Sequence, residues 1–324
     1  MNKKRQLILT TFLVRTTYFG IGISYCLRYG KNLTILLMLL GMILGYFLLN
    51  ILLSCNLTKF FKTKIGSLLI LILSFFIINN SLISFGILGS NFYLANTPPL
   101  LIIISLSILI LYGISKGLKT TLRLIDILIF ISIPLLFFIF LSISHNISFD
   151  NYLPLELNFS LDLLKSVIGS MVYSTTPLLL ELYLLKEPDK PSIKKGYIIG
   201  NLTIILMVIY LIGIFGSNFA LNYRYPEYIL LKKINIFNQF LHLETFLALI
   251  WFNDLLTTSL LAGHIIAKTF KGKRLYLVST IHILFNHYFF ISNYQHILLI
   301  YHYTIYILLV PLILTIFLSK VSSQ

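Results

Sequence analysis

Ten stretches of about 20 mostly apolar residues follow one another along this chain of 324 residues, with short polar or charged connections between them. A helix of about 20 residues crosses the ~30 Å hydrocarbon core of a bilayer, and it pairs its backbone polar groups within its own segment. Only 11% of the residues are charged, against roughly 25% in soluble domains. The sequence therefore predicts an all-α polytopic membrane protein that forms a single membrane domain over residues 1–324. The predicted spans are residues 6–25, 33–53, 65–89, 98–115, 122–144, 161–185, 196–217, 243–267, 275–291 and 297–319.

The positive charges indicate how the chain crosses the bilayer. With an even number of spans both termini lie on one side, and the termini and the connections on that side hold 18 of the 25 Lys and Arg residues. Cytoplasmic segments are enriched in Lys and Arg, so both termini are predicted to be cytoplasmic. The net charge of +15 then reflects topology and attraction to anionic lipid, and no nucleic-acid partner is predicted from it.

Two of the spans are interrupted by residues that loosen a helix. The first contains Gly20-Ile21-Gly22, and the sixth contains Ser174-Thr175-Thr176-Pro177. A break at bilayer depth leaves backbone groups without partners, so breaks of this kind are tolerated beside a polar cavity or a bound solute. Because the breaks are five spans apart and five is odd, residues 1–144 and 161–319 are predicted to form a five-plus-five inverted repeat (LeuT-like).

The interrupted segments are the predicted solute site, near the bilayer midplane between spans one, three, six and eight. Half-helix N-termini suit a carboxylate, and freed carbonyls and hydroxyls suit an ammonium group or a cation. The expected solute is therefore small and amino-acid-like. The candidate substrate-binding residues are Gly20, Ile21, Gly22, Tyr173, Ser174, Thr175 and Thr176.

A second set of candidates consists of ionisable residues in or near spans, which are costly in hydrocarbon and often functional. Arg15 could pair with Glu181, Asp254 or a solute carboxylate, or reach toward the cytoplasmic face. Glu181 is a candidate for carrying a coupling proton or for a structural salt bridge, and Asp254 for contacting a solute or a coupling ion such as H⁺ or Na⁺. Glu244 precedes Asp254 by about 15 Å of helix, so we assign it to an outer gate or a loop anchor.

The sequence indicates no catalytic or cofactor chemistry. It has no nucleotide-binding loop, no Gly-x-Ser-x-Gly and no His-Glu-x-x-His pattern. His282, His287, His296 and His302 gather near the C-terminus, but their spacing and the lack of acidic or Cys neighbours favour interfacial positions over a metal site. We therefore expect no enzyme, no cofactor and no bound metal.

One stretch carries a family resemblance. Tyr225-Pro226, followed by Ile234, Phe240, Glu244 and Trp251, resembles the Tyr-Pro loop and acidic, Trp-bearing eighth span of the spore-germination permeases. Those proteins are the polytopic subunits of bacterial germinant receptors, in the amino acid–polyamine–organocation superfamily. The chain departs from the family at Arg15, where relatives are usually apolar or small, and it lacks a Pro soon after Gly20-Ile21-Gly22.

The resemblance implies a germinant-binding permease subunit in a bacterial cell or spore inner membrane. It also implies two partners, a second multi-span subunit and a lipoprotein. Two other functions stay open on the sequence: a stand-alone amino acid transporter coupled to H⁺ or Na⁺, and a structural membrane scaffold whose buried acids form internal salt bridges.

Overall fold

The computed structural model describes residues 3–94, 96–155, 160–185, 188–220, 225–232, 249–270 and 296–321. Every element within these ranges is helical, which confirms the predicted all-α class. Among the described residues, six helical segments are long and apolar enough to cross a membrane, and two further apolar helices are shorter. The six are Ile23–Ser54, Lys64–Leu88, Leu118–Asn146, Leu161–Leu184, Lys190–Phe215 and Leu249–Phe270, and the shorter two are Pro99–Ser115 and Thr304–Ser319.

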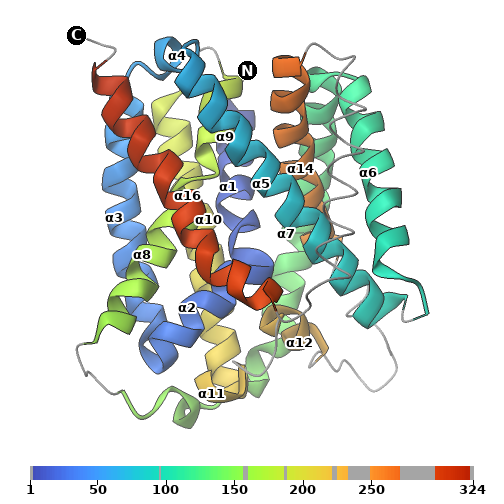
Figure 1. Ribbon diagram of the computed structural model, residues 1–324. Helices are drawn as coiled ribbons and strands as arrows, with labels where there is room; N and C mark the ends of the chain where they lie inside the picture. The colour runs from blue at the N-terminus through green and yellow to red at the C-terminus, as the bar shows by residue number, and fades with distance from the viewer. Residues whose placement is uncertain are drawn as a thin grey trace. The chain divides into compact units, whose positions relative to one another are not determined.

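The helices follow the sequence in the order shown in Figure 1. They are α1 (Lys3–Thr16), α2 (Ile23–Gly30), α3 (Thr34–Ser54), α4 (Leu57–Phe60), α5 (Lys64–Leu88), α6 (Pro99–Ser115), α7 (Leu118–Ile143), α8 (Leu161–Thr175), α9 (Leu178–Leu184), α10 (Lys190–Phe215), α11 (Ser217–Ala220), α12 (Pro226–Lys232), α14 (Leu249–Phe270) and α16 (His296–Val321). Short π or 3₁₀ turns cover Tyr18–Gly22, Lys31–Leu33, Gly89–Tyr93, Ser144–Asn146 and Phe149–Tyr152.

Helix boundaries agree with the sequence where a capping residue or a proline marks them. The predicted spans 33–53, 65–89 and 98–115 match α3, α5 and α6 to within one residue at each end. The Thr63 side chain accepts the Gly66 N–H at 3.0 Å and so caps α5, while a proline opens α6. The predicted span 275–291 lies outside the described residues.

The start of α10 corrects one prediction. Residues 186–195 were expected to be a loop, but α10 begins at Lys190. Asp189 is its N-cap, with its carboxylate accepting the Ser192 N–H at 3.2 Å, and Pro191 lies in the first turn. The hydrogen bond from the Ser192 hydroxyl is the largest cause that holds the pKa of Asp189 below its usual value. The segment is therefore helical from Lys190 in spite of its polar composition, because the Asp189 cap and Pro191 favour the start of a helix.

The chain divides into two compact units, each built from several separate segments. Unit 1 comprises residues 1–51, 127–178 and 189–253, and unit 2 comprises residues 52–126, 179–188 and 254–324. Each unit thus draws on both halves of the sequence.

In unit 1, α1 packs along α10 (Figure 1). A Cβ at Gly196 would lie 2.5 Å from the Leu7 carbonyl oxygen, and one at Gly200 would lie 2.8 Å from the Val14 Cβ. These glycines are four residues apart and form a Gly-x-x-x-Gly face, which allows two membrane helices to approach closely. The backbone of α1 therefore rests almost directly on α10.

A second Gly-x-x-x-Gly face joins α3 to α8 in the same unit. A Cβ at Gly41 would lie 2.6 Å from the Ser170 Cβ, and one at Gly45 would meet the Tyr197 hydroxyl and lie 2.8 Å from the Thr175 Oγ1. Glycine is thus needed at both positions because side chains of α8 and α10 occupy the space. In the same unit α2 lies against α8, and the Ser166 hydroxyl donates to the Cys26 carbonyl at 3.1 Å.

The loop before α8 closes the C-terminal end of α10. The Ser148 N–H and the Asn151 side-chain amide both donate to the Gly213 carbonyl at 2.8 Å, and the Tyr152 hydroxyl donates to the Ile209 carbonyl at 2.9 Å. The last four carbonyls of a helix lack intrahelical partners, so this loop supplies donors for the Gly213 carbonyl, and the Tyr152 hydroxyl adds a bond further inside the helix.

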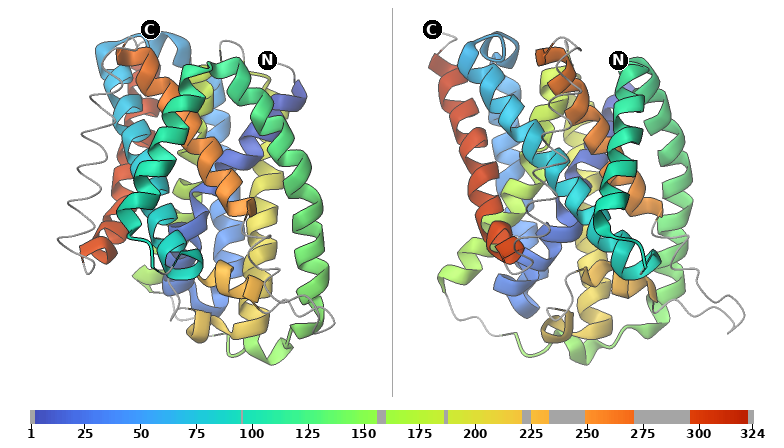
Figure 2. Two further views of the ribbon diagram at one scale, coloured as in Figure 1. Left: turned by 90° about the vertical axis from the view of Figure 1, so that its right-hand side faces the viewer. Right: turned by 45° about the vertical axis from the view of Figure 1, so that its right-hand side comes forward.

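In unit 2, α5 packs against α6 and α16 (Figure 2). A Cβ at Gly89 would lie 2.8 Å from the Ile102 side chain of α6, and a Cβ at Gly113 of α6 would come still closer to the Leu260 side chain of α14. The Thr121 hydroxyl of α7 lies 2.8 Å from the His264 Nε2 of α14. Small residues and paired polar side chains therefore hold this unit together as well.

We predict that Gly45→Val destabilises the protein by about 1–3 kcal/mol, the usual cost of overpacking, because the added side chain enters the space of Tyr197 and Thr175. Leu44→Val is the matched control, since Leu44 is 47% exposed on the same helix. The melting temperature of the detergent-purified protein measures both. Equal melting temperatures for the two variants would contradict the proposed α3–α8 contact.

Candidate functional site

The first predicted break is a π-helical turn. Residues Tyr18–Gly22 form the turn, and the Ile23 N–H donates to the Tyr18 carbonyl, five residues back. The sequence predicted unwound backbone at Gly20–Gly22. The structure has a π-helical turn instead, and its wider hydrogen-bond spacing keeps the backbone paired. Turns of this type insert one residue into a helix and are frequent at functional sites.

The second predicted break separates α8 from α9. The Thr176 N–H still donates to the Val172 carbonyl at 3.0 Å, but Pro177 has no N–H to give to the Tyr173 carbonyl. The Thr17 hydroxyl, just before the π turn, donates to that carbonyl instead. One hydrogen bond thus joins the two interruptions, which are 156 residues apart in the sequence.

Side-chain packing also brings the two interruptions together. A Cβ at Gly22 would lie 3.2 Å from the Tyr173 Cγ. The Tyr173 ring centroid lies 6.1 Å from that of Tyr18 and 6.0 Å from that of Tyr25. Gly22 therefore provides the space that the Tyr173 ring needs beside the π turn.

A group of buried hydroxyls, the hydroxyl cluster, lies beside this contact and consists of Tyr18, Ser170, Ser174 and Tyr197. The Tyr18 hydroxyl donates to the Ser170 carbonyl at 2.7 Å and lies 2.9 Å from the Ser170 Oγ. The Ser174 Oγ lies 2.8 Å from the Tyr197 hydroxyl. All four side chains are fully buried. Unit 1 therefore encloses a cluster of polar side chains between otherwise apolar helices.

Of the sequence-predicted substrate residues, Ile21, Gly22, Tyr173, Ser174, Thr175 and Thr176 are buried in unit 1, and Gly20 lies within the π turn. The structure thus brings both predicted segments to one place. Tyr18, Ser170 and Tyr197 of the hydroxyl cluster were missed, as was Asn201, whose Oδ1 accepts a hydrogen bond from the Tyr18 hydroxyl at 3.3 Å. The sequence held a signal for Ser170, because Ser166, Ser170 and Ser174 recur every four residues and so share one helix face.

An aromatic chain leads from the π turn to the Tyr-Pro segment. The Phe19 ring centroid lies 5.5 Å from that of Trp251 in α14, which lies 6.0 Å from that of Tyr228 in α12. Tyr225 and Glu227, on either side of Pro226, are also buried. Glu227 was missed as a candidate, and it lies in the first turn of α12, where the helix dipole favours an acidic residue.

Three of the ionisable candidates are almost completely buried: Arg15 is 4% exposed, and Glu181 and Asp254 are 0% exposed. The Arg15 guanidinium carbon lies 4.8 Å from the centroid of the Phe12 ring, a cation–π distance. Arg15 belongs to unit 1, whereas Glu181 and Asp254 belong to unit 2, so their pairing stays a prediction. Glu244, His282 and His287 lie outside the described residues.

The bond between the interruptions can be tested by a double-mutant cycle. We predict that Thr17→Val lowers the free energy of unfolding by about 1–3 kcal/mol, because it removes the hydrogen bond that the Thr17 hydroxyl donates to the buried Tyr173 carbonyl. In a Pro177→Ala background the alanine N–H can donate to that carbonyl, so the loss is expected to fall below about 0.5 kcal/mol.

Thr203→Val is the control for this cycle, since the Thr203 hydroxyl is exposed and donates to the Ile199 carbonyl of its own helix. Thermal unfolding of all variants in one detergent gives the comparison. An equal loss from Thr17→Val in both backgrounds would show that Pro177 does not create the need for the Thr17 hydroxyl.

Comparison with known proteins gives one family. A family model described as "Spore germination protein" matches residues 6–296. A search of curated proteins gives no match.

Proposed function

The chain belongs to the spore germination protein family, and on that premise we propose that it is the permease-like subunit of a germinant receptor and binds a small amino-acid-like solute beside its two helix interruptions. The resemblance drawn from Tyr225-Pro226 and Trp251 is confirmed by the family match. The family and the apolar helices make it a permease-like membrane protein of germination. The identity of the solute, the location of its site, and the absence of catalysis and cofactors are our proposals.

The contact between the interruptions carries this proposal. Burying a polar group costs free energy unless the group finds a hydrogen-bond partner. Membrane helices therefore contain few such groups in their apolar interior. Here the Thr17–Tyr173 hydrogen bond and the hydroxyl cluster concentrate such groups at one place in unit 1. We assign the solute to this place because its polar groups can replace the mutual bonds of the hydroxyls.

The chemistry of the hydroxyl cluster favours a zwitterion. Tyrosine and serine hydroxyls both donate and accept hydrogen bonds, so Tyr18 or Tyr197 can donate to a carboxylate while Ser174 accepts from an ammonium group. Gly22, Gly41 and Gly45 leave no room for side chains where they contact α8. A solute of few atoms, such as a small amino acid, therefore fits the proposal better than a large one.

We also propose the five-plus-five inverted repeat, with two matching contacts in its support. Spans two and seven hold equivalent positions in the two halves, and each carries a Gly-x-x-x-Gly face: Gly41 with Gly45 in α3, and Gly196 with Gly200 in α10. The first face packs on α8, the interrupted span of the second half, and the second packs on α1, in the interrupted span of the first half. This exchange of equivalent contacts is what a two-fold pseudo-symmetry axis produces.

The proposal includes the surroundings of the protein. We propose that the protein lies in the inner membrane of a bacterial cell or spore with both termini in the cytoplasm, and the distribution of Lys and Arg supports this orientation. A second multi-span subunit and a lipoprotein are the proposed partners, as the family resemblance implies. In a receptor of this kind, the solute would shift a conformational equilibrium that the partners read.

Coupled transport is the second candidate function, and the burial of Glu181 and Asp254 favours it. Both carboxyls are 0% exposed, and buried acids in membrane helices often carry protons or contact ions. A third possibility is a structural scaffold, in which these acids only stabilise the fold. The binding and transport experiments below distinguish it from the other two functions.

Binding is tested with the full chain in nanodiscs and a panel of radiolabelled amino acids. We predict saturable binding of one or a few small amino acids, weakened about tenfold by Ser174→Ala, a loss of ~1.4 kcal/mol. Ser142→Ala is the matched control, because the Ser142 hydroxyl also bonds its own helix but is exposed. Absence of binding in folded protein would favour the scaffold, and equal affinities in both variants would move the site elsewhere.

Transport is tested in proteoliposomes with and without a pH gradient. If the protein is a coupled permease, the wild type shows gradient-driven uptake, and Glu181→Gln, which cannot carry the proton, abolishes that uptake while keeping solute binding. Binding without uptake in the wild type would assign the protein to sensing alone. Uptake that Glu181→Gln leaves unchanged would exclude Glu181 as the coupling acid.

A further inference from the structure

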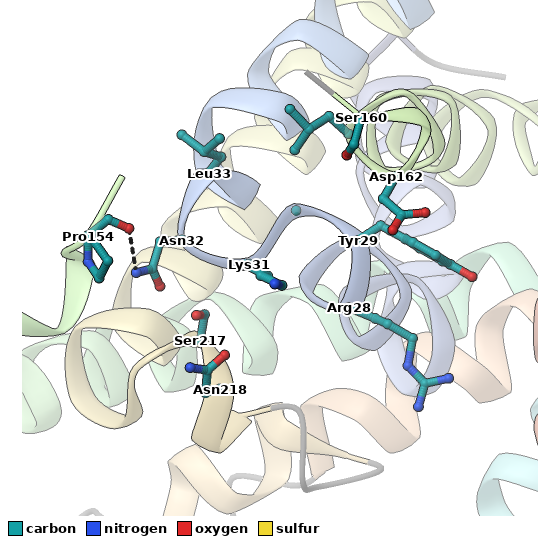
Figure 3. Close-up of a pocket in the computed structure, with 12 residues that line it drawn as sticks. Arg28, Tyr29, Lys31, Asn32, Leu33, Pro154, Ser160, Asp162, Ser217 and Asn218 are labelled. Carbon is teal, nitrogen blue, oxygen red and sulfur yellow. Dashed lines mark hydrogen bonds between the residues drawn. The ribbon is translucent and has the colours of Figure 1, made fainter. Parts of the chain in front are cut away.

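A second polar site lies in unit 1, away from the interruptions. A cavity of about 260 Å³ opens where α2 ends, α8 begins and α11 begins (Figure 3). Its lining includes Arg28, Lys31, Leu33, Ser160, Asp162 and Leu163. None of them belongs to the hydroxyl cluster or to the sequence-predicted site.

Lys31 in the cavity wall has a backbone conformation that favours glycine. Its φ is 46° and its ψ is −129°, and among the described residues no other non-glycine residue has a positive φ. The Thr34 hydroxyl donates to the Lys31 carbonyl at 2.6 Å and holds the turn. Residues with side chains adopt such conformations at a cost, and strain of this kind is often kept at functional sites. Because glycine would relieve the strain, a lysine here indicates a use for its side chain.

The charges around the cavity favour an anion. Arg28 and Lys31 line it, and Lys31 lies at the centre of the labelled residues in Figure 3. The negative charge of Asp162 is balanced by Lys165, whose Nζ lies 2.8 Å from the Asp162 carboxylate and 4.8 Å from the centroid of the Tyr29 ring. The described lining thus holds two cationic side chains, Arg28 and Lys31, and one anionic side chain, Asp162, and this formal net charge of +1 favours an anion.

Two further features complete an anion site with an apolar side. α8, a helix of 15 residues, begins at the cavity, and its N-cap Ser160 makes no side-chain capping bond. Such a helix N-terminus favours a negative group. Leu33 and Leu163 belong to an apolar cluster with Leu37 and Val167 and give the cavity an apolar wall.

We propose that this cavity binds the carboxylate of a small organic solute, with Arg28, Lys31 and the start of α8 facing the carboxylate and Leu33 and Leu163 facing its alkyl part. The volume lies just below the 300–1,000 Å³ typical of sites for drug-sized ligands, so the ligand has few heavy atoms. The site is separate from the proposed amino-acid site and does not depend on it.

The test uses the full chain in phosphatidylcholine nanodiscs, with propionate as the probe and propionamide as its uncharged analogue. Saturation-transfer NMR is expected to detect propionate and not propionamide. Lys31→Gly is expected to weaken propionate binding at least fivefold while leaving the melting temperature equal or higher, because it removes the charge and the backbone strain together. Arg28→Gln weakens binding in the same way, and Lys31→Arg retains it.

Two controls separate this site from others. Lys116→Gln removes an exposed lysine of unit 2 and is expected to leave propionate binding unchanged, as is Ser174→Ala in the hydroxyl cluster. Propionate binding that survives both Lys31→Gly and Arg28→Gln would overturn the proposal. Loss of binding when phosphatidylglycerol is added to the nanodisc would assign the cavity to a lipid headgroup and would also overturn a solute site.

Discussion

Every backbone N–H and C=O inside hydrocarbon must find its partner within the protein, because the bilayer core offers none. Pro177 breaks this condition in α8 by removing the donor for the Tyr173 carbonyl, and the Thr17 hydroxyl restores it from another helix. The π turn at Tyr18–Gly22 meets the same condition by shifting its hydrogen bonds to a spacing of five residues. Both interruptions therefore keep their backbone groups paired, the first within its own turn and the second through the Thr17 hydroxyl.

Polar side chains inside the helices follow the same rule. The hydroxyls of Thr10, Thr16 and Ser74 each donate to the carbonyl four residues earlier, so their own helix supplies an acceptor for each buried hydroxyl. The hydroxyl cluster differs, because Tyr18, Ser174 and Tyr197 bond across helices. Hydroxyls that bond between helices can exchange their partners for the polar groups of a solute. For this reason we propose that the solute binds at the hydroxyl cluster.

Close backbone packing positions these groups. Gly41 and Gly45 bring α3 onto α8, and Gly196 and Gly200 bring α10 onto α1, so that Tyr197 reaches Ser174 and Tyr18 reaches Ser170. A membrane offers little hydrophobic force between helices, and small residues that permit close contact contribute more of the association energy. At Lys31, by contrast, the backbone is held in a conformation that is unfavourable for a residue with a side chain. We propose that anion binding by the Lys31 side chain is the reason that a lysine is kept there.

The sequence by itself determined the helical class, most helix boundaries and the positions of both interruptions, because apolar length, capping residues, glycine and proline act locally. It could not determine that the first interruption is a π turn, or that Gly22 in this turn leaves space for the ring of Tyr173, which is distant in sequence. It identified Ser174 but missed Tyr18, Tyr197 and Glu227, whose burial depends on helices distant in sequence. The cavity beside Lys31 was also beyond the sequence, because α2, α8 and α11 meet only in the folded unit. Local physical chemistry thus fixed the elements, and only tertiary packing decided which polar groups they bring together.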